Sequence, residues 1–514
     1  MKKHFLIFGL TAGLFIQPSL AQQKTTANAT VAKTATKPAG GKTIPNDPSV
    51  IIGKLPNGLT YYIRKNVEPK NRAELYLGNR IGSLMETDAQ QGLAHFTEHM
   101  AFNGTKDFPK NEMINYLQKA GVRFGADLNA YTGFNQTVYQ LPIPTDSIEV
   151  FKTGFKILAN WAGKVSMEGK DIDNERGVII EEDRARGKNA QQRISTALMP
   201  FLLGNSQYAK RIPIGKVDIL NSFTHDKIRS FYNDWYRPNL QTVIAVGDFD
   251  VKQVEDLIKQ NFSDLKNPAN PKPRQNYDLP DNVQPLVKIV TDKEQPYNIA
   301  QVIYKQHEGP IKTDADYRKS LIHSMINNML SARIQELTQK GGAPFLFAQS
   351  SYGSYQGGLV WGVSALTTVA VAPTSAGLEK AILGALAENE RMAKFGFTPG
   401  EFETVKKKIE AGIEKKYKEK DKTKSASYVQ EYLENFLTGA SIPSADYTYE
   451  LTKKIMQELT LAEVNAIAKT MVPKTNQIIV VQAPEKDAKD LPTEAQLIAP
   501  LKNAGNGITP YVDN

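Results

Sequence analysis

The chain has 514 residues, no cysteine and a formal net charge of +9. The lack of cysteine excludes disulfides and any zinc site built from thiolates. The length predicts about two domains, and the scattered positive charge, without an arginine-rich or aromatic motif, does not indicate binding to nucleic acid.

Residues 1–21 are predicted to be a secretory signal peptide. Lys2 and Lys3 form a basic tip, an apolar run follows from Phe5 to Phe15, and small residues precede a cleavage position after Ala21. This run is too short to cross a bilayer core of about 30 Å, and no later stretch approaches that length. We therefore expect a mature chain without a membrane span, secreted to the periplasm or the exterior of a Gram-negative-type bacterium.

Residues 22–46 are predicted to be a disordered leader, because they are rich in Thr, Ala, Lys and Gly with few large apolar side chains. A first domain is expected over residues 47–265. It opens with a predicted hairpin around the turn Pro56-Asn57-Gly58, and Ala73–Leu77 is the next predicted strand.

The stretch from Gly92 to Met100 predicts a helix that carries a metal site. Apolar residues at three- and four-residue spacing form its buried stripe: Leu93, Phe96 and Met100. His95 and His99 lie one turn apart, so both imidazoles can approach one ion. Zinc binds neutral imidazoles tetrahedrally and keeps one position open when it is catalytic, and Glu98 beside it could take a proton from water. The alternative is a hydrogen-bonded pair of histidines without metal.

A hairpin is predicted next, formed by Asn129–Thr132 and the alternating strand Thr137–Leu141. From these residues alone, Asn129 is expected to cap an ordinary turn.

The third metal ligand is expected from the helix that contains Glu175, Ile179 and Glu182. These positions share one helical face. Two carboxylates on an apolar stripe are unfavourable unless they are paired or bound to a cation. The alternative is an exposed charged helix without a ligand.

A second copy of the domain is predicted over residues 286–490, after a linker at 266–285 that is dense in Pro, Asn and charge. Its strands and helices follow the order of the first domain, but His323 stands alone, so no second metal site is expected. The glycines between Phe345–Phe347 and Leu359–Trp361 predict a hairpin turn. Residues 491–514 are expected to form a C-terminal tail.

These motifs resemble the pitrilysin/insulinase family of inverted zinc peptidases, especially its secreted bacterial members. The resemblance extends from about Pro45 to Pro484, and its most specific parts are three segments: His95 to Thr105, Leu128 to Thr132 and Glu175 to Glu182. It implies an α+β protein of two similar domains, each an antiparallel-rich sheet with helices packed on one face, as in metallohydrolases of the mitochondrial-processing-peptidase type.

The resemblance also implies one zinc ion per chain, held by three ligands: His95, His99 and Glu182. Glu98 would be the general base and Glu175 a supporting carboxylate. The separation of Glu182 from the histidine motif is slightly longer than the family pattern, so Glu181 remains an alternative ligand. Asn129 and Ala130 would lie on a strand edge that pairs with an extended peptide substrate. His225 is expected in the first turn of its helix and not as a ligand.

The activity expected from this resemblance is zinc-dependent endopeptidase cleavage of peptides or small unfolded proteins in the cell envelope. Long family members carry two such halves, so this chain is expected to pair as a homodimer, to pair with a second family half, or to be part of a longer form. The alternatives are a zinc-containing binding or assembly subunit that needs a partner, and a zinc hydrolase or lyase that does not cleave peptides.

Overall fold

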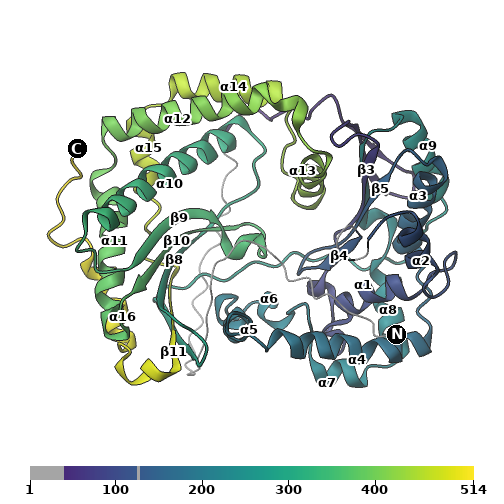
Figure 1. The fold of residues 1–514 in the computed structure, drawn as a ribbon, viewed down its shortest axis with the longest axis horizontal. Coiled ribbons are helices and arrows are strands. Elements are labelled where there is room, and N and C mark those ends of the chain that lie inside the picture. The colour runs from purple at the N-terminus through teal and green to yellow at the C-terminus, as the bar shows by residue number, and fades with distance from the viewer. Residues whose placement is uncertain (1–39, 124, 126–127, 514) are drawn as a thin grey trace.

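The computed structural model describes residues 40–123, 125 and 128–513, and the elements before the linker form a mixed sheet with helices packed against it (Figure 1). Among the described residues this sheet has six strands in the order β1-β2-β6-β3-β5-β4. Their bounds are β1 (Ile51–Lys54), β2 (Thr60–Lys65), β3 (Arg72–Asn79), β4 (Asn129–Thr132), β5 (Thr137–Pro144) and β6 (Gln241–Gly247). β2 and β6 are parallel, and the other neighbouring strands are antiparallel. β4 is an edge strand because it stands last in the strand order.

The helices of this first domain are α1 (Leu93–Asn103), α2 (Glu112–Lys119), α3 (Ile148–Gly163), α4 (Gly169–Arg186), α5 (Ala190–Leu202), α6 (Gln207–Lys210), α7 (Val217–Ser222), α8 (His225–Trp235) and α9 (Val251–Phe262). α3 packs on β3 and β5 through an apolar stripe that includes Phe151, Phe155 and Leu158. α1 contacts α4, α8 and the edge strand β4. The helix predicted to carry the metal site is therefore beside both the predicted glutamate helix and the open edge of the sheet.

The second sheet repeats five of the six strands of the first, without a counterpart of β1 among the described residues. Its order is β7-β11-β8-β10-β9. These strands correspond one by one to β2-β6-β3-β5-β4 of the first sheet. The bounds are β7 (Leu286–Asp292), β8 (Asn298–His307), β9 (Phe347–Ser354), β10 (Val363–Ala372) and β11 (Gln477–Pro484). β7 and β11 are parallel, as β2 and β6 are. The prediction of two similar α+β domains is confirmed.

The helices of the second domain are α10 (Asp314–Lys340), α11 (Leu378–Phe395), α12 (Pro399–Lys418), α13 (Ser425–Thr438), α14 (Ala445–Glu458), α15 (Leu461–Ala468) and α16 (Glu494–Asn503). α10 lies between β8 and β9 in the chain, as α1 lies between β3 and β4. α10 and α11 pack against strands of their own sheet.

One helix of the second domain, α13, packs against the first sheet (Figure 1). It covers the face opposite to α3. Tyr76 of β3 points to this face, whereas its neighbours Leu75 and Leu77 point to the core under α3. The Tyr432 ring stacks on Tyr62 with 5.7 Å between ring centroids. The first sheet is therefore covered on one face by its own helices and on the other by a helix from the second domain.

The end of the predicted disordered leader is ordered in the structure. Ile44 is 3% exposed, and its N–H donates to the carbonyl of Lys312 at 3.0 Å. Thr43 also forms a bridge with Thr313. This end of the leader thus packs on the second domain through the buried Ile44 and backbone contacts to Lys312 and Thr313, which the local composition does not reveal. The predicted signal peptide and residues 22–39 lie outside the described residues.

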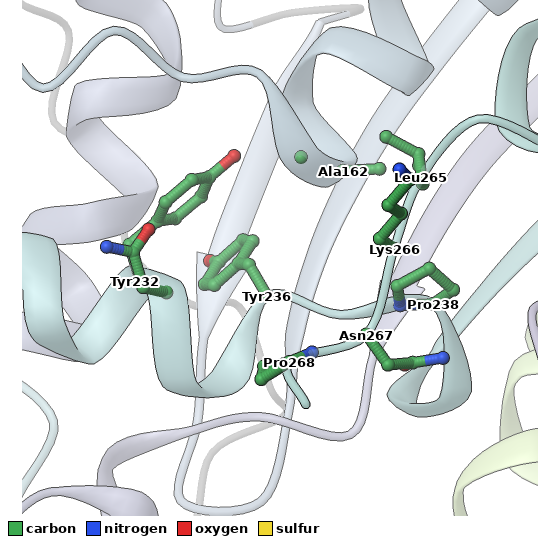
Figure 2. Close-up of a pocket in the computed structure, with 10 residues that line it drawn as sticks. Ala162, Tyr232, Tyr236, Pro238, Leu265, Lys266, Asn267 and Pro268 are labelled. Carbon is green, nitrogen blue, oxygen red and sulfur yellow. The ribbon is translucent and has the colours of Figure 1, made fainter. Parts of the chain in front are cut away.

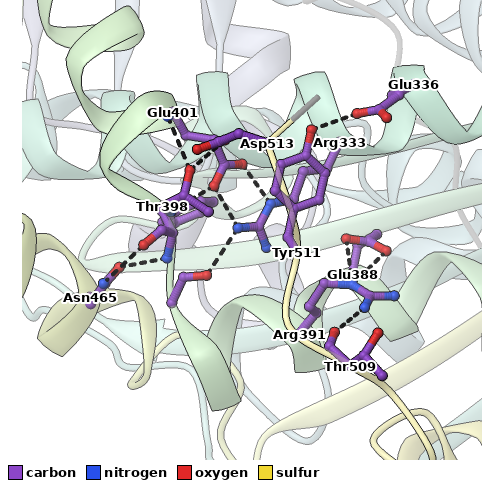
Figure 3. A network of polar contacts seen from close by, with 12 residues as sticks. Arg333, Glu336, Glu388, Arg391, Thr398, Glu401, Asn465, Thr509, Tyr511 and Asp513 are labelled. Carbon is purple, nitrogen blue, oxygen red and sulfur yellow. Dashed lines mark hydrogen bonds and ion pairs between the residues drawn. The ribbon is translucent and has the colours of Figure 1, made fainter.

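The C-terminal segment is part of the second domain rather than a separate tail. α16 packs on α11 and buries Leu497. Further along, the Tyr511 ring lies over the guanidinium of Arg333 at 4.5 Å, and its hydroxyl donates to Glu336 at 2.6 Å (Figure 3). Arg333 is itself buried and paired with Glu401 at 2.6 Å. This network attaches the chain to α10 and α12 as far as residue 513.

The glycine-rich hairpin is present, but its second strand starts later than predicted. β9 begins at Phe347, whereas β10 begins at Val363 and not at Leu359. The intervening residues form a longer turn, in which Gly357, Gly358 and Gly362 have φ of 66°, 86° and 76°. Such backbone conformations favour glycine over residues with a side chain.

The linker segment 266–285 contains no helix or strand. A cavity of about 350 Å³ lies where the linker leaves the first domain, between Leu265, Pro268 and the end of α8 (Figure 2). Tyr232 and Tyr236 form part of its wall, and the predicted metal ligands do not. Among the described helices, none has the length and apolar character needed to cross a membrane.

Candidate metal centre

Two contacts outside the motif fix the start of α1. Gly92, which precedes α1, has φ of 100°. A Cβ on Gly215 would lie only 2.4 Å from the Cα of Gly92, so the two backbones touch where the chain enters α1. Glu86 accepts the N–H of Ala94 through Oε1 at 2.8 Å, which satisfies one free amide of the first turn. Arg211 in turn donates to the Glu86 carbonyl at 2.8 Å.

Three predicted ligands converge in the structure: His95, His99 and Glu182. Their ligand atoms all lie within 4.8 Å of one another. The Oε2 of Glu182 is 3.7 Å from Nε2 of His95 and 3.5 Å from Nε2 of His99. Tetrahedral zinc with bonds of about 2.0–2.1 Å would separate its ligand atoms by about 3.3–3.4 Å. The donor atoms and their spacing therefore fit a zinc ion.

Glu175 orients His99. Its Oε1 is 2.8 Å from Nδ1 of His99, and its Oε2 accepts from the Asn103 amide at 2.7 Å. This contact assigns the proton to Nδ1 and leaves Nε2 facing Glu182. Burial opposes a charged imidazole, but the hydrogen bonds to Glu175 and Glu182 raise the pKa of His99 to about 10. In the absence of metal, the cluster therefore holds a proton that a metal ion would displace.

His95 is held neutral. Burial, followed by the neighbouring His99, lowers the pKa of His95 to about 3. Its Nδ1 is buried and has no hydrogen-bond partner among the described residues. A neutral imidazole is the form that binds metal.

The side chains of Glu182 and its neighbour Glu181 contact different residues. Glu182 uses Oε1 to pair with Arg186 at 2.7 Å and turns Oε2 toward the histidines. Despite its burial, these partners hold the pKa of Glu182 well below its usual range. Glu181 instead pairs with Arg184 at 2.7 Å, and its side chain is 52% exposed. The structure brings Glu182, and not Glu181, to the histidines.

Glu98 lies beside the cluster and is buried. Thr132 on β4 donates its hydroxyl to Oε2 of Glu98 at 2.6 Å. Burial raises the pKa of Glu98 to about 7, a value suited to a group that accepts and returns protons near neutrality. Sequence reasoning missed the role of Thr132, although the residue ends the Leu128 to Thr132 segment.

Asn129 and Ala130 lie at the other end of the edge strand β4, and both are partly buried. Asn129 faces Gln140 across the ladder with β5. Its side chain accepts the N–H of Ala130 at 2.9 Å. The structure thus places both residues on an edge strand that contacts α1.

The other histidines that the structure describes lie outside this cluster. His225 is the first residue of α8, where its Nε2 lies 2.9 Å from Asp173. His323 on α10 packs its ring against Tyr352 with centroids 4.2 Å apart. Among the described residues, no other group of three potential metal ligands comes together.

Two family models match the chain. The model described as insulinase (peptidase family M16) matches residues 61–212, and the model of the peptidase M16 inactive domain matches residues 222–409. The first match contains the whole metal cluster, and the second covers most of the domain that repeats its fold. Both matches agree with the resemblance inferred from the motifs.

Named relatives and a solved structure show how much of a longer protein the chain represents. The probable zinc protease PqqL of Haemophilus influenzae is 31% identical over 448 residues, which is 85% of this chain and 47% of that protein. PqqL of Escherichia coli is 32% identical over 81% of this chain and 44% of that protein. The chain thus spans about half the length of these relatives.

The crystal structure of the first half of the periplasmic protease PqqL from Escherichia coli matches 92% of this chain and all of that half. The match has a TM-score of 0.85 and 29% identity. Together with the two family models, this shows that the chain belongs to the insulinase family of peptidases, family M16.

Proposed function

We propose that this chain is a zinc-dependent endopeptidase that cleaves peptides or small unfolded proteins in the cell envelope. The observation that carries the proposal is the convergence of His95, His99 and Glu182 beside Glu98, next to the edge strand β4. The names of the relatives, which are zinc proteases, and the periplasmic location of Escherichia coli PqqL support it.

Two imidazoles and one carboxylate would hold the zinc ion: His95, His99 and Glu182. When bound, zinc supplies Lewis-acid chemistry that polarises a carbonyl and makes water more acidic. Glu175 keeps Nε2 of His99 directed at the cluster by accepting a hydrogen bond from the Nδ1–H of His99.

Glu98 moves the proton. As general base it removes a proton from the attacking water and then delivers it to the leaving amine. Thr132 binds Oε2 of Glu98 and so keeps the carboxylate in one orientation, with Oε1 left for the proton. Burial raises the pKa of Glu98, which favours a carboxyl group that can hold the proton between the two transfers.

The edge strand β4 would bind the substrate as an additional strand. Main-chain hydrogen bonds hold an extended peptide with little dependence on its sequence. Asn129 already occupies the N–H of Ala130, so a peptide that uses this amide must displace the Asn129 side chain. This mode of binding requires an unfolded segment and favours a peptidase over a zinc hydrolase of small molecules.

The chain also has a second candidate role, as a zinc-containing binding or assembly subunit. It matches the first half of a longer protease over nearly its whole length, so a second half would come from a second copy, from a different family half or from the rest of a longer form. If one half alone binds peptide without cleaving it, this role applies.

The test is cleavage of a mixed peptide library by residues 22–514, with and without the neutral zinc chelator 1,10-phenanthroline, beside Glu98→Gln. We expect chelator-sensitive cleavage that is at least about a thousandfold slower in the variant, because removing a general base that is also the proton donor combines two catalytic losses. Zinc content, measured by atomic emission, should be the same in both proteins.

Two results would redirect the proposal. Near-wild-type cleavage by Glu98→Gln would exclude Glu98 as the base. One bound zinc without any cleavage would favour the subunit role, and peptide binding would then be measured with and without a partner half.

A further inference from the structure

Arg80 has a side chain for which the described residues offer no polar partner. It directly follows β3, on the sheet face of Tyr76 and Gly78, which α13 covers. Among the described residues its side chain forms no hydrogen bond or ion pair, and its Nε is buried. Buried N–H groups are nearly always bonded, so this side chain requires an explanation.

A second arginine, Arg274 of the linker, lies beside it. Its Nε donates to the Arg80 carbonyl at 2.9 Å, its Nη2 donates to Asn135 at 3.1 Å, and its Nη1 donates to Asn276. The guanidinium lies 5.5 Å from the centre of the Trp361 ring. All these partners are neutral, so among the described residues the guanidinium of Arg274 lies against the Arg80 backbone without a carboxylate partner.

The pKa shifts of the two arginines indicate that their site lacks a negative charge. Burial and the nearby Arg80 lower the pKa of Arg274 to about 10, and burial lowers the pKa of Arg80 as well. Neither arginine forms an ion pair with a described acidic residue; Asp278, on the same linker, is exposed, although its charge reaches Tyr208 as that of Arg274 does. Two like charges in a partly buried site are unfavourable unless an anion offsets them.

The arginines also lie where three parts of the molecule meet. Asn135 belongs to the turn between β4 and β5, Arg274 to the linker, and Trp361 to the hairpin turn of the second domain. Asn135 also donates to the buried Tyr208 hydroxyl at 3.1 Å. The site is therefore built from fixed groups, only a few residues beyond the end of β4.

We propose that Arg80 and Arg274 bind an oxyanion at this junction, supplied either by a peptide carboxylate or by free phosphate. Guanidinium groups bind both anions through paired N–H donors. Free phosphate would bind whatever the activity of the chain. A peptide carboxylate would belong to a substrate laid along β4, and only that source rests on the proposed function.

The test is calorimetric titration of the zinc-loaded chain with inorganic phosphate and with acetyl-trialanine, at constant ionic strength. We expect saturable binding of one or both at a single site, weakened at least tenfold in Arg80→Met. Arg80→Lys, which keeps the charge but loses the paired donors, should also bind more weakly. Arg184→Met is the matched control, because Arg184 is exposed on α4, and it should bind as the wild type does.

Acetyl-trialanine amide separates the two sources. If acetyl-trialanine binds, or displaces phosphate, and acetyl-trialanine amide does neither, the bound anion is a peptide carboxylate. If phosphate binds and neither peptide displaces it, the anion is free phosphate.

Melting temperature distinguishes anion binding from a structural role. In anion-free buffer Arg80→Met should melt no lower than the wild type, because it removes an uncompensated charge. The proposal is overturned if neither probe binds saturably, if Arg80→Met binds as tightly as the wild type, or if this variant melts several degrees lower without any anion. Cleavage by the wild type and by Glu98→Gln is measured separately, so failure here leaves the proposed function intact.

Discussion

The candidate metal centre depends on which oxygen each carboxylate presents. Glu182 presents Oε2 to two imidazoles because Arg186 holds Oε1. Glu175 presents Oε1 to His99 because Asn103 holds Oε2. Each carboxylate is thus anchored at one oxygen and directed by the other, which gives the ligand set its geometry.

The choice between Glu182 and Glu181 can be tested with matched variants. Glu182→Gln should lower zinc affinity by at least about a hundredfold, because loss of a direct ligand costs more than the tenfold to hundredfold loss of a supporting group. Glu181→Gln should bind zinc normally, since Glu181 pairs only with residues on the exposed side. Competition with a chromophoric chelator measures both affinities, and equal losses would contradict the assignment.

Thr132 should act on turnover and not on zinc binding. Thr132→Val keeps the branched shape but removes the hydroxyl that donates to Glu98. A hydrogen bond to a charged group contributes about 1.5–3 kcal/mol, so we expect kcat to fall roughly tenfold to a hundredfold. Thr132→Ser should restore most of kcat. Steady-state kinetics and zinc content check this, and an unchanged kcat in Thr132→Val would show that Glu98 needs no such partner.

At the scale of elements, the linker is held by buried polar contacts to both domains. Arg237 donates to the carbonyl of Lys272 at 2.6 Å, and Lys305 on β8 donates to that of Pro280 at 2.8 Å. Lys305 is 6% exposed. A buried ammonium with one carbonyl acceptor is costly, so this contact is expected to depend on pH.

Burial lowers the pKa of Lys305 from 10.5 to about 8, against the opposing effect of Asp281. Between these values the unfolded chain binds more protons than the folded one, so stability rises with pH. Relative to Lys305→Met, the wild type should gain on the order of 3 kcal/mol from pH 8 to pH 10.5, and the difference should be constant below pH 8. Urea unfolding across this range measures the difference, and a flat difference would contradict the expected desolvation.

At the scale of the whole molecule, α13 joins the two domains. It supplies Val429, Tyr432, Leu433 and Leu437 to a core that also contains residues of β2, β3 and β6. The core beneath α3 also extends into the second domain, where it includes Tyr355 and Ile478. The domains therefore share apolar cores on both faces of the first sheet, and we expect them to unfold together.

Leu433→Ala on α13 tests this coupling. Loss of a buried leucine costs about 2–5 kcal/mol, and the side chain is 3% exposed against Gly78 of β3. Both domains should lose stability at the same denaturant concentration, as followed by hydrogen exchange of β3 and β11. The matched exposed variant Leu383→Ala on α11, 37% exposed, should change little. Destabilisation confined to the second domain would contradict the coupling.

The amino-acid sequence by itself determined the features that depend on local spacing. His95, Glu98 and His99 lie within one helical turn, Glu175 and Glu182 lie two turns apart, and strand and helix periods repeat after the linker. These patterns follow from the geometry of single helices and strands, so they predicted the helix and the duplicated fold correctly and singled out the ligand candidates that converge in the structure.

Only the tertiary structure decided the contacts that join distant parts of the chain. Thr132 reaches Glu98 across 34 residues, and Arg274 reaches Arg80 across 194. Ile44 and α13 each pack against the other domain. No periodicity encodes these contacts, because they depend on how two folded units pack and which buried groups then lack partners. For that reason the sequence could point to Glu98 as a candidate base, whereas its threonine partner and the unpaired arginine could not be predicted.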